Sequence, residues 1–258
     1  MVVWRKGKKQ MSELVTLITC TGWRPAAWAL CQKFIARQTF KGPIQWVVVY
    51  DEPGIEPQSS PDILKCKNIK QEFHPSVKDW RPGINTQRFN MDEALKHVKG
   101  DYIFVVEDDD WYAPNYLETF MYLLQRFDIV GQADSKYYNI KERSWRKWGN
   151  NKHTSLCETG LKRSKLDLLD RAVNSGDLFF DMQLWNIVHG EKHSNLIFQH
   201  IGLVVGMKGL PGRVGIGGGH HQTDGFTRDP RFDVLKEWIG LEDTQEYVKI
   251  AQANFKGS

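Results

Sequence analysis

The sequence has few of the features that mark secreted, zinc-binding or membrane-spanning proteins. Its four cysteines are scattered along 258 residues. No two of them are spaced as C-x-x-C, so neither a zinc motif nor a disulfide framework is indicated. Free thiols favour a reducing compartment. Apolar runs such as "WVVVY" are far shorter than the roughly 20 residues that cross a bilayer. We therefore expect a cytoplasmic protein, with contact to a membrane surface as the alternative.

Charge of one sign is not in large excess either. The formal net charge is +4, which is compatible with a phosphate-bearing ligand but too small to indicate nucleic-acid binding by itself. The start of the chain, "MVVWRKGKKQ", is basic and has no apolar stretch after it, so it is not a secretory signal. We expect residues 1–12 to be flexible.

What the sequence does contain is an alternation of strand and helix patterns. "ELVTLITCTG", "KGPIQWVVVYDEP" and "DYIFVVE" have the apolar, β-branched composition of buried strands, and residues 63–73 are a candidate for a further strand. "RPAAWALCQKFIARQTF" and "NTQRFNMDEALKHVKG" have helical spacing, and Asn85 or Thr86 is a candidate cap for the second, which Gly100 would end. The alternation predicts an α/β fold with an open, mostly parallel sheet and helices on both faces.

Polar side chains follow three of these strands, at residues 19–21, 51–52 and 107–110. Ligands of open parallel sheets bind beyond the carboxyl ends of the strands, so these segments fall on the ligand edge. The run of four acids at 107–110 is costly unless a cation relieves the repulsion. Carboxylates are the oxygen ligands that Mg²⁺ and Mn²⁺ prefer. The alternative is a solvated acidic turn before a helix that starts near Pro114.

These segments together resemble a known family. "KGDYIFVVEDDDWYAPNYLE" resembles the central motif of the family 2 glycosyltransferases, in which a strand ends in a DxD-type signature followed by an aromatic residue and a proline. "VTLITCTGWRPAAWALCQKFIARQTF", "QWVVVYDEP" and "NTQRFNMDEALKHVKG" are similar to that family's first strand and helix, second strand and "ARN.G...A.G" helix. The resemblance implies one GT-A domain over residues 1–258. Residues 13–118 would form its nucleotide-sugar-binding half, and residues 119–258 a less regular acceptor-binding half.

The resemblance also implies roles for individual residues. Asp109 matches the main metal ligand, and Asp108 would face the ribose or share the metal. Glu107 stands where the family usually has its first aspartate. Asp110 is a candidate helix cap instead. The further residues that the resemblance places at the donor are Thr19, Thr21, Arg24, Asp51 and Arg88; for the last, a helix-surface ion pair is the alternative.

Two later segments complete the candidate site. "SGDLFFDMQLWNIVHG" resembles the family's acidic segment that supplies the general base, which implies Asp181, with Asp177 as the competing residue. "GIGGGHHQTDG" is a glycine-rich loop in which His220 or His221 is a candidate metal ligand or diphosphate contact; a surface loop is the alternative. "SWRKWGNNKH" favours a β-hairpin that covers part of the core over an aromatic acceptor platform.

The sequence therefore predicts a metal-dependent glycosyltransferase that uses Mn²⁺ or Mg²⁺. It would move a sugar from a nucleotide-sugar, with a UDP-sugar as first choice, to an acceptor hydroxyl with inversion. The acceptor stays open between a glycan, a protein, a lipid-linked glycan and a nucleic acid. The alternatives are a catalytically inactive nucleotide-sugar-binding protein and a nucleotidyltransferase of similar fold. The latter usually has a glycine-rich loop after the first strand, where this chain has only "TCTGWRP".

Overall fold

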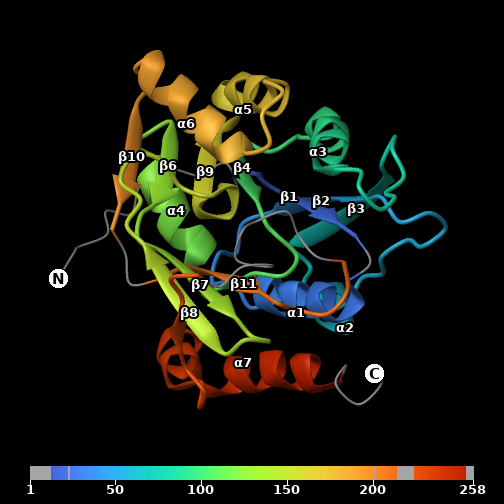
Figure 1. The fold of residues 1–258 in the computed structure, drawn as a ribbon. Helices are drawn as coiled ribbons and strands as arrows, with labels where there is room; N and C mark the ends of the chain where they lie inside the picture. Colours follow the sequence, from blue (N-terminus) through green and yellow to red (C-terminus); the bar gives the residue numbers. More distant parts are fainter. Residues whose placement is uncertain (1–12, 23, 200–201, 214–223, 254–258) are drawn as a thin grey trace.

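A computed structural model describes residues 13–22, 24–199, 202–213 and 224–253 (Figure 1). The expectation of a flexible segment at residues 1–12 lies outside this part. The first half contains β1 (Val15–Thr21), α1 (Pro25–Ala36), β2 (Ile44–Tyr50), α2 (Pro61–Lys65), β3 (Ile69–Pro75), α3 (Gln87–Lys96) and β4 (Tyr102–Val105). The second half contains β5 (Trp111–Tyr112), α4 (Tyr116–Leu124), β6 (Ile129–Gln132), β7 (Ser135–Asn139), β8 (Ser144–Trp148), β9 (Thr159–Lys162), α5 (Leu166–Val173), α6 (Phe180–Gly190), β10 (Asn195–Phe198), β11 (Val204–Lys208), β12 (Thr227–Arg228) and α7 (Asp233–Ala253).

The larger of the two sheets has seven strands in the order β10-β6-β9-β4-β1-β2-β3. β9 runs antiparallel to β4 and β6, whereas the other neighbours pair in parallel. Val15 of β1 lies beside Ile44 of β2 and Tyr102 of β4. The carboxyl ends of β1, β2 and β4 therefore meet at one edge. The predicted open, mostly parallel sheet is confirmed.

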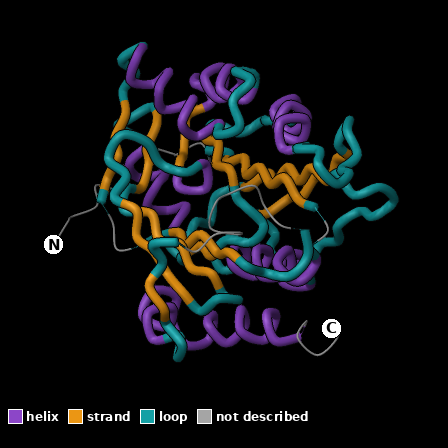
Figure 2. Tube along the Cα trace, in the orientation of Figure 1, coloured by secondary structure: helices purple, strands orange, loops and turns teal. Residues whose placement is uncertain are grey.

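The alternation of side chains along β2 shows why this sheet is covered on both faces. Trp46 and Val48 pack into the cluster that contains α1 and α4. Val47 and Val49 pack into the cluster that contains α3, α5 and α6. Successive strand residues point to opposite faces, so a strand that is apolar throughout needs a helix layer on each side. Figure 2 shows these layers around the strands.

The second sheet has five strands in the order β12-β8-β7-β11-β5. β7 and β8 form an antiparallel hairpin, as predicted for the segment that includes "SWRKWGNNKH". α7 lies along this sheet in Figure 1, and it breaks at Gly240, whose φ of 82° suits glycine. α7 therefore consists of two helical parts, one on each side of Gly240.

Two element boundaries differ from the sequence predictions. The third strand begins at Ile69, because residues 61–65 form α2, where the Ser60 hydroxyl accepts a hydrogen bond from the Ile63 N–H at 3.3 Å. α3 ends at Lys96, four residues before Gly100. Gly100 serves a close approach instead, since a Cβ there would lie 2.7 Å from the Leu14 carbonyl oxygen. None of the helices in the described ranges combines the length and apolar character needed to span a bilayer.

Candidate active site

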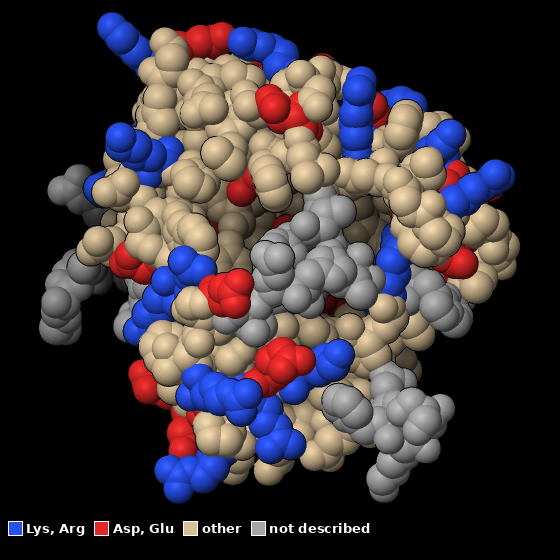
Figure 3. Space-filling model, in the orientation of Figure 1, with Lys and Arg blue, Asp and Glu red and all other residues tan. Residues whose placement is uncertain are grey.

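A cavity of about 850 Å³ opens at the carboxyl ends of β1, β2 and β4. Figure 3 shows a hollow in the middle of this face of the molecule. The donor-side residues predicted from the sequence that line the cavity are Arg24, Asp51, Glu107, Asp108 and Asp109. Asp181 and Trp148 line it from the second half of the chain. The fold thus brings both groups of predicted residues to one space.

Arg24 holds the two central acids of the acidic run. Its guanidinium donates from Nη1 to Asp109 Oδ2 at 2.6 Å and from Nη2 to Asp108 Oδ1. The Thr21 hydroxyl donates to the other oxygen of Asp108 at 2.6 Å. Burial lowers the pKa of Arg24, but the charges of Asp108, Asp109 and Glu107 raise it by more than burial lowers it. The net shift of the pKa is upward, so the guanidinium stays charged. Thr21 and Arg24, which the resemblance places at the donor, thus lie beside these acids; their contact with a donor stays a prediction.

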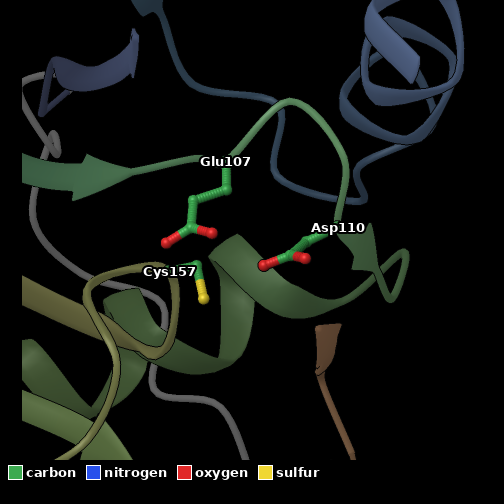
Figure 4. A group of neighbouring side chains, drawn as sticks. All are labelled: Glu107, Asp110 and Cys157. Carbon is green, nitrogen blue, oxygen red and sulfur yellow. The ribbon is translucent and has the colours of Figure 1, made fainter. Parts of the chain in front are cut away.

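Asp110 takes part in a second buried group, with Glu107, Cys157 and Lys208. Figure 4 shows the carboxylates of Glu107 and Asp110 turned toward the thiol of Cys157, and the three side chains offer ligand atoms within 4.8 Å of one another. Asp110 Oδ1 accepts a hydrogen bond from the Met207 N–H at 2.8 Å, and Lys208 Nζ lies 3.8 Å from the same oxygen. Asp110 therefore does not cap the following helix through its side chain in any described contact.

Burial sets the protonation of this second group. It raises the pKa of Asp110 well above the usual range and also raises that of Glu107, while Lys208 opposes both shifts. Burial followed by the charge of Glu107 raises the pKa of the Cys157 thiol, which is therefore not a thiolate. Burial lowers the pKa of Lys208, but Asp110, Asp109 and Glu107 raise it to a net increase. Lys208 thus supplies a fixed positive charge.

Asp51 is buried at the end of β2 and is held by α3. Its Oδ2 accepts hydrogen bonds from the Thr86 hydroxyl and from Asn90 Nδ2, the latter at 2.9 Å. Its Oδ1 accepts one from Arg213. Thr86, a candidate helix cap in the sequence, precedes α3 without a side-chain capping bond, because its hydroxyl is used by Asp51.

Three of the predicted donor-side residues, Thr19, Thr21 and Arg88, do not line the cavity. The Thr19 hydroxyl donates to the Val106 carbonyl at 2.8 Å and accepts from Trp46 Nε1 at 2.9 Å, so it ties β1 to the end of β4. Arg88 points to α5, where it donates to Asn174 Oδ1 at 3.0 Å, and it also lies 3.9 Å from Asp92. Arg88 therefore has the helix-surface position that the sequence left as its alternative.

Asp181 lies in the first turn of α6 and lines the cavity, whereas the competing Asp177 is exposed and does not. Burial raises the pKa of Asp181, and the charge of His153 partly opposes the shift. A carboxylate with a raised pKa is a better proton acceptor near neutral pH. His220 and His221 lie outside the described residues, so their predicted roles stay predictions.

No pattern in the sequence selects three of the residues found here: Lys208, Cys157 and Arg213. Lys208 ends β11, a strand that the sequence patterns did not indicate, and Arg213 follows it in a glycine-containing loop. A lysine directly after the run "VVGM" is the one feature that could have indicated a charge partner at a strand end.

The carboxylates present fit a divalent cation. Oxygen donors from Asp108, Asp109 and Asp110 converge on the cavity, and Asp110 Oδ2 is buried without a hydrogen-bond partner among the described residues. Mg²⁺ and Mn²⁺ prefer carboxylate oxygens as ligands, and here an oxygen without a hydrogen-bond partner lies beside other carboxylates.

The fold is that of the GT-A nucleotide-diphospho-sugar transferases. PcManGT, a mannosyltransferase from Pyrobaculum calidifontis solved with GDP-Man and Mn²⁺, aligns over 95% of this chain and 74% of its own. The alignment has 13% identity and a TM-score of 0.52. TarS 1–349 from S. aureus, solved with UDP-GlcNAc, aligns over 75% of this chain at 12% identity and a TM-score of 0.46. The chain spans 58% of that TarS fragment and 36% of a longer TarS chain.

Residues 64–180 match the sequence model described as "Glycosyl transferase family 2", and no curated protein sequence matches the chain. This part of the chain is therefore similar to glycosyl transferase family 2. The resemblance drawn from the sequence motifs is therefore confirmed, as is the GT-A fold.

Proposed function

We propose that this protein transfers a sugar from a nucleotide-sugar to an acceptor hydroxyl. The observation that carries the proposal is the meeting of Asp51, the acidic run and Asp181 around one cavity. In family 2 these are the positions expected for the donor's base, its diphosphate and the catalytic base. The mannosyltransferase with the same fold binds GDP-Man, so a nucleotide-sugar is the donor class, with a UDP-sugar kept as first choice from the sequence motifs.

A divalent metal ion is part of the proposal. Asp109 would hold it, with Asp108 or Asp110 as the neighbouring carboxylate, and His220 or His221 as a further ligand. When bound, such an ion supplies Lewis-acid stabilisation of the departing diphosphate. Arg24 occupies Asp109 Oδ2, so metal binding and this ion pair share one carboxylate. Mn²⁺ accompanies GDP-Man in the mannosyltransferase structure and is our first choice.

The chemistry assigned to the chain's own side chains is proton transfer and positioning. Asp181 would accept the proton of the acceptor hydroxyl, since a sugar hydroxyl is a poor nucleophile until its proton is removed in the transition state. Lys208 and Arg24 would keep the acids in place and offset their charge. With the acceptor on the α6 side and the donor on the side of β1, β2 and β4, attack from the face opposite the leaving group would invert the anomeric centre.

A thermal-shift and turnover assay tests this function. UDP or GDP with Mn²⁺ should raise the melting temperature, because a ligand that binds only the native state stabilises it. Asp109→Asn should lose the metal-dependent part of the shift, and turnover should fall at least about a hundredfold. Asp62→Asn, on exposed α2, is the matched control. An unchanged metal response in Asp109→Asn would contradict the ligand assignment. Binding without turnover of any nucleotide-sugar would favour the inactive binding protein.

A further inference from the structure

Arg213 reaches the carboxyl end of β2 from the loop after β11, although it is 162 positions from Asp51 in the chain. Its Nη2 donates to Asp51 Oδ1 at 2.5 Å. Its guanidinium carbon lies 4.9 Å from the centre of the Trp80 ring. The Arg213 side chain is 17% exposed and that of Asp51 is 0% exposed. A planar cation therefore lies between a buried carboxylate and an indole ring in the lining of the cavity.

Two hydrogen bonds other than that of Arg213 orient the Asp51 side chain. Thr86 and Asn90, at the start of α3, both donate to Oδ2. That leaves Oδ1 as the oxygen turned toward Arg213 and Trp80. Because Oδ2 is fixed by these two hydrogen bonds, Oδ1 is an acceptor with a fixed direction, and it can bind an N–H group of a ligand.

The fit of Arg213 in this place is incomplete. Its Nη1 is buried without a hydrogen-bond partner among the described residues, and leaving a buried donor unpaired is unfavourable. The contact with β1 is tight, since a Cβ on Gly22 would lie 1.9 Å from Arg213 Nη2. The space bounded by Gly22, Asp51 and Trp80 is therefore shaped for a flat group, and Arg213 fills it with one donor left unpaired.

The proposed function already places the donor's base at Asp51; on that basis, we propose that Trp80 stacks on the base and that the Arg213 guanidinium competes with the base for this space. A guanidinium and a nucleobase share the features that matter here. Both are flat, both stack on an aromatic ring, and both offer an N–H to a carboxylate. In uracil or guanine the ring N–H would take the place of Arg213 Nη2 on Asp51 Oδ1, with the base stacked on Trp80. Arg213 then lowers the fraction of molecules that can bind donor.

Nucleotide affinity of Trp80 and Arg213 variants tests the proposal, measured by calorimetry with UDP, GDP and inorganic pyrophosphate. Trp80→Ala should weaken UDP or GDP binding about tenfold through loss of base stacking. Its affinity for pyrophosphate, which lacks a base, should not change. Arg213→Ala should strengthen nucleotide binding by about threefold, since the competing group is removed. Arg213→Lys keeps the charge but not the flat group and should fall between Arg213→Ala and the wild type. Trp238→Phe, on α7, is the control for losing an indole elsewhere.

The outcomes separate this inference from the proposed function. If wild type binds no nucleotide, the proposed function itself is wrong. If wild type binds nucleotide and Trp80→Ala binds it equally well, the base lies elsewhere and the subsite is overturned. If Arg213→Ala weakens nucleotide binding, Arg213 contacts the donor and does not compete with it. If Trp80→Ala weakens pyrophosphate binding as strongly as UDP binding, the effect is a general loss of structure and the stacking assignment is overturned.

Discussion

The two halves of this protein bury acids in two different ways. On the proposed donor side, Asp108 and Asp51 are each bound by an arginine, Arg24 and Arg213. On the proposed acceptor side, Glu158 is 3% exposed and is bound by Gln132 and Ser135, which are neutral. Burial raises the pKa of Glu158 to about 8. The first group thus has arginine cations that offset its buried carboxylates, whereas Glu158 has only neutral partners and a pKa raised by burial.

This difference has a functional meaning. A buried carboxylate that stays charged can exchange its arginine for a metal ion or an N–H of a ligand. A protonated acid held by neutral groups has no such use and serves the packing between the two sheets. Asp181 stands between these cases, because it is partly buried, lines the cavity and has a pKa raised mainly by burial.

The largest expected effect is on Asp181. Asp181→Asn should lower the turnover number by roughly a hundredfold or more, since it removes the proton acceptor. Donor affinity should not change. In the wild type, activity should fall as pH drops through the raised pKa of Asp181, because the base works as the carboxylate. Kinetics across pH 5 to 8 measure both effects.

Asp177→Asn is the matched control for this prediction, since Asp177 is exposed four residues earlier. Equal losses in both variants, or a pH profile unaltered by Asp181→Asn, would assign the proton acceptor to another group.

A smaller effect, on stability, should follow from Arg24→Ala. This change leaves Asp108 and Asp109 buried without their cation, which should lower the free energy of unfolding by about 3 kcal/mol. Mn²⁺ should restore part of the loss if the metal binds the same carboxylates. Denaturant unfolding with and without Mn²⁺ measures this. Arg88→Ala, which breaks an exposed pair, should cost under about 1 kcal/mol; a similar cost for both arginines would mean that the donor-side acids do not depend on pairing.

The last prediction concerns Glu158→Gln, for which we expect a change in the pH dependence of stability and not a loss of stability at one pH. The folded pKa of Glu158, about 8, lies above the usual 4.5. Its protonation stabilises the fold fully below the lower value, and the stabilisation is lost as pH rises through the upper one. As the pH rises between these two pKa values, the titration of Glu158 lowers the free energy of unfolding by about 1.4 kcal/mol per pH unit. The variant, which cannot lose that proton, should show a flatter profile between pH 5 and 7.5.

Glu142→Gln, on the exposed turn of the β7–β8 hairpin, is the control for this measurement. If the slope of the Glu158→Gln variant equals that of wild type and of this control, Glu158 is charged in the folded protein. The contrast between the two halves would then be wrong.

The residues themselves determined the elements and their order. Apolar periodicity and strand-end acids were enough to predict the mostly parallel sheet, its ligand edge, and the placement of Asp51, Asp108 and Asp109 at that edge. Asp181 was implied only by the family resemblance, which left Asp177 as the competing residue. These features are local, because a strand or helix pattern is read from neighbouring residues and parallel strands end at the same edge.

Only the tertiary structure decided which side chains meet. Thr19 joins two strands, Arg88 turns to α5, and Arg213 crosses the molecule to Asp51. Lys208 comes to lie beside Asp110 through the pairing of β11 with β5. Such contacts depend on strand order, register and crossovers between distant segments. Those arise from the packing of the whole core, so no short stretch of sequence contains them.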